Sequence, residues 1–137
     1  MSREIKFRAW LKDENKMYSV SELQLSQDGV VCCNLGDYEG PYFYVDLKDI
    51  ELMQYTGLKD KNGVEIYEGD VFIDEYDGYI GVIKYGKKFA WFIVEWYINS
   101  HSKEPCDDEP LGHINIHNIE VIGNIYENLE LLEVENE

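Results

Sequence analysis

The sequence lacks paired cysteines and long apolar runs, and each absence excludes a class of protein. Three cysteines occur in 137 residues. An odd count without a C-x-x-C pair is neither a disulfide framework nor a zinc signature. No apolar run approaches the length of about 18 residues that a membrane helix needs, and the first six residues are charged rather than apolar. These features predict reduced thiols, no membrane association and a cytoplasmic location.

Basic charge is scarce. The chain has 12 Lys and Arg against 28 Asp and Glu, which gives a formal net charge of −16 at pH 7. Such a field repels nucleic acid phosphates and anionic lipid head groups, so direct nucleic acid binding is not expected. The same field either attracts basic proteins or simply keeps a concentrated protein in solution. The excess of acidic over basic residues continues into residues 127–137, which we predict to be an acidic tail.

The signatures of common enzymes are also absent. There is no G-x-S-x-G elbow, no phosphate-cradling glycine loop and no dinucleotide fingerprint, so neither catalysis nor a cofactor is predicted. His113 and His117 stand four residues apart but lack the intervening glutamate of a zinc protease. Adding His101 and Cys106 gives spacings that match no known zinc cluster. We therefore expect surface histidines and no metal site.

Two charged clusters have a structural and a functional interpretation. Residues 107–109 and the pair Asp74 and Asp77 offer carboxylates, but neither has the alternating acidic pattern of a calcium loop. Lysines at positions 84, 87 and 88 lie near Tyr85 and Phe89, a combination that single-stranded nucleic acid can use. With a net charge of −16, solvated surface is the expectation for both.

What the sequence does contain is a strand pattern. Aromatic residues make up 14% and hydrophobic residues 45% of the chain, which indicates a packed core. Residues 5–10 alternate with period two, and a polar turn at 13–16 predicts a hairpin with residues 17–20. Further short strands are expected at the following segments: 30–33, 42–45, 52–55, 71–73, 79–85, 89–97 and 114–121, the last with an irregularity near His117 and Asn118. Asn62-Gly63 is typical of a tight turn, and Asn128 is expected to cap a short C-terminal helical turn.

The segment 89–97 is apolar at eight of its nine positions. It is either a central strand covered on both faces or a strand with one face exposed for a partner. For the second case Trp91, Trp96 and Tyr97 are the candidate contact residues. The polar loop 99–112 that follows is longer than most connections, and such loops are either functional or mobile.

Four segments resemble one known family. They are REIKFRAW at 3–10, MQYTGLKDKNG at 53–63, EIYEGDV at 65–71 and VIGNIYEN at 121–128, and they are similar to the YopX family of phage and prophage proteins. The resemblance implies a mainly β protein with one domain over residues 1–137. Within it, an antiparallel β-meander is expected at 1–64, a small SH3-like barrel at 65–126 and the acidic tail at 127–137.

The resemblance supplies no catalytic or ligand-binding residues. Its most distinctive motif is Tyr67, Glu68, Gly69 and Asp70, where Gly69 and Asp70 suit a tight turn entering a strand. The leading hypothesis is a non-enzymatic phage accessory protein of the host bacterial cytoplasm that binds another protein or itself. One alternative is an acidic mimic of nucleic acid that blocks a host DNA-binding protein. The other is a metal-dependent enzyme of nucleic acid metabolism, which would need carboxylates or histidines converging in a cleft.

Overall fold

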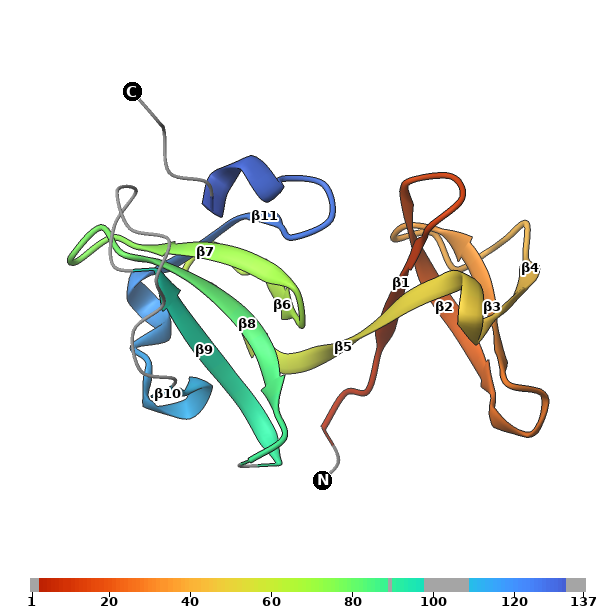
Figure 1. The fold of residues 1–137 in the computed structure, drawn as a ribbon, viewed down its shortest axis with the longest axis horizontal. Helices are drawn as coiled ribbons and strands as arrows, with labels where there is room; N and C mark the ends of the chain where they lie inside the picture. Colours follow the sequence, from red (N-terminus) through yellow and green to blue (C-terminus); the bar gives the residue numbers. More distant parts are fainter. Residues whose placement is uncertain (1–2, 89, 98–108, 133–137) are drawn as a thin grey trace. The chain divides into compact units, whose positions relative to one another are not determined.

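Antiparallel strands make up most of the structure. A computed structural model describes residues 3–88, 90–97 and 109–132 (Figure 1). The chain divides into two compact units, up to Tyr55 and from Thr56 onward. This boundary lies earlier than the one after residue 64 that the sequence suggested. Strand β5 (Ile50–Lys59) crosses it, so its first half belongs to the first unit and its second half to the second.

The first unit is built from antiparallel strands. Its strands are β1 (Phe7–Leu11), β2 (Lys16–Gln24), β3 (Gly29–Asn34) and β4 (Phe43–Asp46), with short 3₁₀ turns η1 (Leu25–Gln27) and η2 (Leu47–Asp49). With β5 and β6 (Glu65–Tyr67) they give the strand order β4-β3-β2-β1-β5-β6. The predicted hairpin is confirmed, since Phe7 faces Val20 and Leu11 faces Lys16. Its turn contains Asn15 at a φ of 52°, a conformation that asparagine tolerates.

Two cysteines lie in the core of this unit. Cys32 and Cys33 are 1% and 0% exposed and carry free thiols. Burial, followed by the neighbouring Cys33, raises the pKa of Cys32 to about 11 from an ordinary 9.0. Burial, followed by the charge of Asp37, also raises the pKa of Cys33. The reactive thiolate is therefore rare at neutral pH.

We expect native Cys32 to react with iodoacetamide at pH 8 about a hundredfold more slowly than the same thiol in urea. That factor is the fall in thiolate fraction between a pKa of 9.0 and one of about 11. Peptide mass spectrometry of timed samples measures the modification at each position. Equal rates in the native and denatured protein would contradict the buried position of this thiol.

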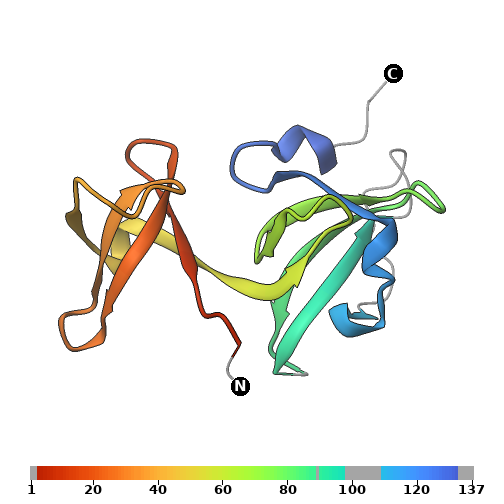
Figure 2. The same ribbon diagram turned by 180° about the vertical axis from the view of Figure 1, so that it is seen from behind.

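The second unit contains a five-stranded antiparallel sheet. Its strands are β7 (Asp70–Asp74), β8 (Ile80–Gly86), β9 (Trp91–Tyr97), β10 (Glu109–Pro110) and β11 (Ile119–Asn124), in the order β10-β9-β8-β7-β11. Strands β7, β8 and β9 lie side by side (Figures 1 and 2). One hydrophobic cluster fills the core with these buried residues: Ile66, Phe72, Ile83, Val94, Trp96, Leu111 and Ile119.

The SH3-like barrel expected over 65–126 is not confirmed. In the described part of the chain the sheets are not closed into a barrel, because β6 pairs within the β5 sheet while β10 and β11 stand at opposite ends of the other sheet. In the part of β10 that the structure describes, Glu109 and Pro110 pair with Val94 and Ile93 of β9.

Two local predictions near the C-terminus are correct only in part. The strand expected over 114–121 was predicted with an irregularity near His117 and Asn118, and the 3₁₀ turn η4 (Ile116–Asn118) lies there. The strand itself, β11, begins only at Ile119, and another turn, η3 (Leu111–His113), comes before residue 114. The Asn115 side chain accepts a hydrogen bond from the backbone of His117, which favours a turn over a strand. A short helix, η5 (Leu129–Leu132), does follow. However, the Asn128 side chain accepts from the earlier Asn124 amide rather than from the helix that it precedes. None of the helical segments within the described residues has the length and hydropathy that a membrane crossing requires.

Candidate functional site

Strand β9 carries the three aromatic residues proposed as a contact surface, but it does not place them together. Side chains alternate along a strand, so Trp96 points to the opposite face from Trp91 and Tyr97. Trp96 is 8% exposed, whereas Trp91 is 50% exposed. The middle of the strand is covered on both faces, since the neighbours Ile93 and Val94 are 6% and 0% exposed. The strand is thus buried at its centre and open at Trp91.

A mostly apolar groove with a volume of about 300 Å³ lies at this open end. We call it the Trp91 groove, and its lining residues are Thr56, Leu58, Trp91, Phe92, Pro110, Leu111, Gly112 and His113. Leu111 is 3% exposed and belongs to the core, while Leu58 remains 38% exposed. Exposed apolar side chains next to a side chain fixed in the core are typical of a surface that binds part of a partner.

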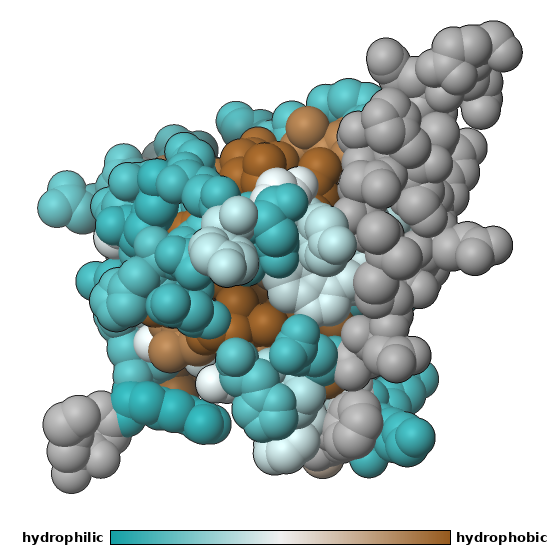
Figure 3. All heavy atoms as spheres, turned by 90° about the vertical axis from the view of Figure 1, so that its left-hand side faces the viewer, coloured by the Kyte–Doolittle hydropathy of each residue, from teal (hydrophilic) through white to brown (hydrophobic). Residues whose placement is uncertain are grey.

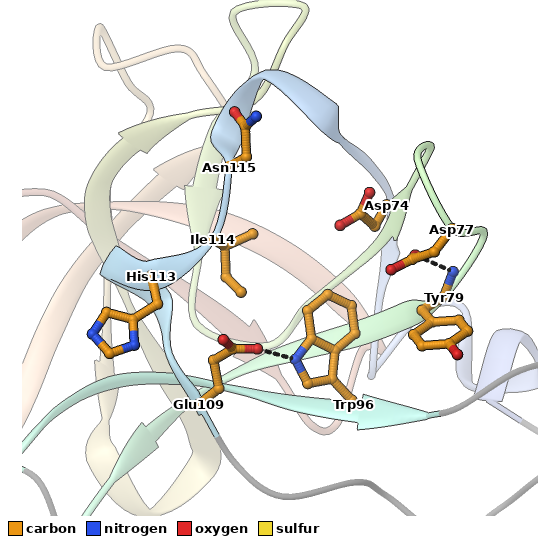
Figure 4. Close-up of a pocket in the computed structure, with 8 residues that line it drawn as sticks. All are labelled: Asp74, Asp77, Tyr79, Trp96, Glu109, His113, Ile114 and Asn115. Atoms are coloured by element: carbon orange, nitrogen blue, oxygen red, sulfur yellow. Dashed lines mark hydrogen bonds between the residues drawn. The ribbon is translucent and has the colours of Figure 1, made fainter.

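A second cavity, lined by both charged and apolar side chains, adjoins the groove. Its volume is about 430 Å³, and we call it the carboxylate cavity (Figure 4). Its lining residues are Asp74, Asp77, Tyr79, Trp96, Glu109, His113, Ile114 and Asn115. Because His113 lines both hollows, the groove and the cavity are neighbours in the second unit.

The three carboxylates of the cavity are held in place by hydrogen bonds. Asp74 and Asp77 each accept one from the backbone amide two residues later, at 3.0 and 2.9 Å. Glu109 accepts one from the indole Nε1 of Trp96 at 2.8 Å. Figure 4 shows the indole between Glu109 on one side and the two aspartates on the other. A carboxylate has about four acceptor sites, so each group can also accept hydrogen bonds from a ligand.

The two histidines in the described part of the chain, His113 and His117, do not form a metal site. Within residues 3–88, 90–97 and 109–132, no three His, Cys, Asp or Glu side chains are arranged to hold a metal ion. His113 lies in η3 and His117 in η4. His101 and Cys106 lie outside the described residues, as do the first two positions of the acidic run 107–109.

The basic and aromatic patch around residue 84 is partly neutralised. The Lys84 ammonium lies 2.7 Å from a carboxylate oxygen of Glu95. Tyr85 is 50% exposed, and Phe89 lies outside the described residues. The ion pair of Lys84 weakens the attraction of this lysine for a phosphate.

The chain as a whole is similar to known proteins. The model of the family described as YopX protein matches residues 6–133. The chain belongs to the YopX family. The crystal structure of protein EF1440 from Enterococcus faecalis is similar to it, with a TM-score of 0.61 and 29% sequence identity over 96% of this chain and 100% of that chain. No match was found among curated proteins.

The YopX motif at positions 67–70 makes contacts that hold the second unit together. The Asp70 carboxylate, 2% exposed, accepts a hydrogen bond from the Tyr67 backbone amide at 2.7 Å. Gly69 adopts a φ of 85°. Its amide donates to the Ile83 carbonyl at 2.8 Å, and its carbonyl accepts from the Ile125 amide at 2.9 Å. No residue of the motif, Glu68 included, lines the groove or the cavity.

Sequence reasoning found part of this YopX surface. It singled out Trp91 and Trp96 as aromatic candidates and noted Asp74 and Asp77 as a pair. It missed Leu58, which lines the groove with Trp91 although 33 positions separate them in the chain. No periodicity or motif links two such positions, because their proximity depends on how β5 and β9 are placed in the second unit.

Proposed function

We propose that this YopX protein is a non-enzymatic accessory protein of phages or prophages that acts in the bacterial cytoplasm by binding another protein. The observation that supports the proposal is the Trp91 groove. An indole that is 50% exposed, next to a leucine that is 38% exposed, leaves apolar area in water. Burying such area against a partner is favourable, and tryptophan is enriched among residues that dominate interface energies.

The charge of the chain bears on the kind of partner. A net charge of −16 makes two copies of this chain repel one another and attracts a protein of opposite charge. On the face of the second unit presented in Figure 3, hydrophobic residues form small patches framed by hydrophilic ones. That arrangement suits a modest interface with a separate partner, and self-association is the alternative that the test must distinguish.

Replacing Trp91 by alanine is expected to reduce partner binding by about tenfold or more, the usual effect of truncating an interface tryptophan. Tagged full-length protein is used to recover partners from bacterial lysate, with quantification by mass spectrometry. The binding of the strongest partner is then measured with purified proteins by calorimetry. The matched control is Tyr38→Ala, which also removes a ring at the surface, 43% exposed, but from the first unit.

Thermal melts of both variants establish that they remain folded. A partner recovered equally by the wild-type protein and Trp91→Ala would contradict a role for the groove. A chain that is strictly monomeric in sedimentation and binds no purified candidate would overturn the proposed function. Association of the wild-type chain with itself, lost in Trp91→Ala, would identify a second copy as the occupant.

A further inference from the structure

We infer that the second unit binds an extended segment of its partner, placing an apolar side chain in the Trp91 groove and an arginine or lysine side chain in the carboxylate cavity. This inference rests on the proposed function and specifies the chemistry of the partner. Three features carry it: the composition of the cavity, its position beside the groove, and the charge of the chain.

The cavity combines two features that a cationic side chain uses. Its walls include Tyr79 and Trp96, whose rings lie edge to face with centroids 6.4 Å apart. Aromatic faces attract a guanidinium or ammonium group, and a planar guanidinium stacks on them. Asp74, Asp77 and Glu109 supply fixed acceptors around the indole, and charge-assisted hydrogen bonds to carboxylates are stronger than neutral ones. A ligand cation would therefore be held by rings and carboxylates together.

The spacing of the two hollows follows from β9. Phe92 lines the groove and Trp96 lines the cavity, and the two residues are four positions apart on this strand, so its length gives the approximate separation of the two hollows. Four residues of a strand span about 13 Å at about 3.3 Å per residue. An extended peptide covers the same distance in about four residues. The basic residue of the partner is accordingly expected three to five positions from its apolar anchor.

The charges favour a basic segment over other occupants. The carboxylate cavity repels the phosphates of a nucleic acid and the acidic surface of a second copy. A short basic and apolar segment satisfies both hollows at once. Arginine is expected to bind more tightly than lysine, because its flat fork of donors matches carboxylates and stacks on rings.

The experiment is selection of an unbiased library of displayed twelve-residue peptides on the full-length protein at physiological salt. The enriched peptides are synthesised with a fluorophore, and their binding is measured by anisotropy. Enrichment of arginine or lysine three to five positions from a large apolar residue is the expected result. Replacing that arginine by citrulline, which removes the charge but keeps the shape, is expected to weaken binding by about tenfold.

Protein variants locate the basic side chain. Asp77→Asn and Glu109→Gln each remove one charge while keeping an acceptor for the Tyr79 amide or the Trp96 indole, and each is expected to weaken binding by about fivefold to tenfold. The matched control is Asp37→Asn. Asp37 also accepts from the amide two residues later, at 3.1 Å, but lies in the first unit. Its loss is expected to leave binding unchanged.

A nuclear magnetic resonance titration adds a direct readout. The indole N–H of Trp96 donates to Glu109, so its resonance is expected to shift on addition of the arginine peptide and to shift little with the citrulline peptide. Peptides that need Trp91 but carry no basic residue, or that bind Asp77→Asn and Glu109→Gln as well as wild type, would overturn this inference and leave the proposed function standing. If Asp37→Asn weakens peptide binding as much as the cavity variants do, the weakening is due to the overall charge of the protein, and this inference is also overturned. If no enriched peptide depends on Trp91 for binding, the result would count against both this inference and the proposed function.

Discussion

Replacing Asp60 by alanine is expected to lower the free energy of unfolding of the second unit by about 3–5 kcal/mol, because it leaves three backbone donors without their acceptor. The Asp60 side chain is 5% exposed. One oxygen accepts from the amides of Asn62 and Val64 at 2.8 and 2.9 Å, and the other accepts from the amide of Val121 at 2.9 Å. A single carboxylate thus closes a local turn and joins it to β11, 61 residues away.

The measurement is urea unfolding followed by fluorescence and circular dichroism. Asp60→Asn serves as the graded control, because an amide keeps one acceptor oxygen but turns a donor toward the remaining N–H groups. The free energy of unfolding of Asp60→Asn should lie between those of the wild-type protein and Asp60→Ala. If Asp60→Ala unfolds at the wild-type urea concentration, the three hydrogen bonds do not carry the stability assigned to them here.

The strands that sequence analysis predicted correctly are those with a local signal. The hairpin of β1 and β2 has alternating residues on both sides of a polar turn, and the structure pairs Ala9 with Tyr18 as that pattern requires. Gly63, expected to permit a tight turn, adopts a φ of 82°. In both cases the information lies within a few residues of the element.

The late start of the strand predicted from residue 114 has a physical cause. Ile114, Ile116 and Ile119 recur at short spacing and look like one face of a strand. All three do pack on the core of the second unit. Only Ile119 reaches it from a strand, however, because Ile116 lies in η4 and Ile114 follows η3. An apolar residue at every second or third position fits either geometry. The decisive feature is the side-chain hydrogen bond of Asn115, which periodicity does not register.

The groove and the cavity depend on contacts between distant parts of the sequence. Trp96 was identifiable as an aromatic candidate, but its Glu109 partner lies 13 positions away, within the segment 99–112 that was predicted to be a polar loop. The YopX motif directed attention to Tyr67 and Asp70. The backbone amide of Tyr67 donates a hydrogen bond to the carboxylate of Asp70. The most distinctive sequence pattern therefore marks residues that hold the fold, and the proposed binding surface is formed from residues outside it.

Replacing Phe72 by alanine is expected to destabilise the second unit by about 3–5 kcal/mol, the usual cost of removing a buried aromatic ring from a packed core. Phe72 is 0% exposed and lies edge to face with Trp96, with ring centroids 5.4 Å apart. Its loss is expected to loosen the indole and thereby reduce peptide binding in the carboxylate cavity. Phe72→Leu, which keeps most of the volume, should lose less stability in the same urea titration.

A double-mutant cycle with Gly81 tests the packing around this ring. A Cβ atom at position 81 would lie 2.5 Å from the Phe72 ring and 2.8 Å from Val94, so Gly81→Ala alone is expected to be destabilising through overpacking. When Phe72 is also replaced by alanine, the closest of these clashes disappears while the contact with Val94 remains. The combined loss of stability is therefore expected to be smaller than the sum of the two single losses. If the two losses of stability are strictly additive, the Phe72 ring does not occupy the space above Gly81. The proposal that Phe72 holds the Trp96 indole in place would then be wrong.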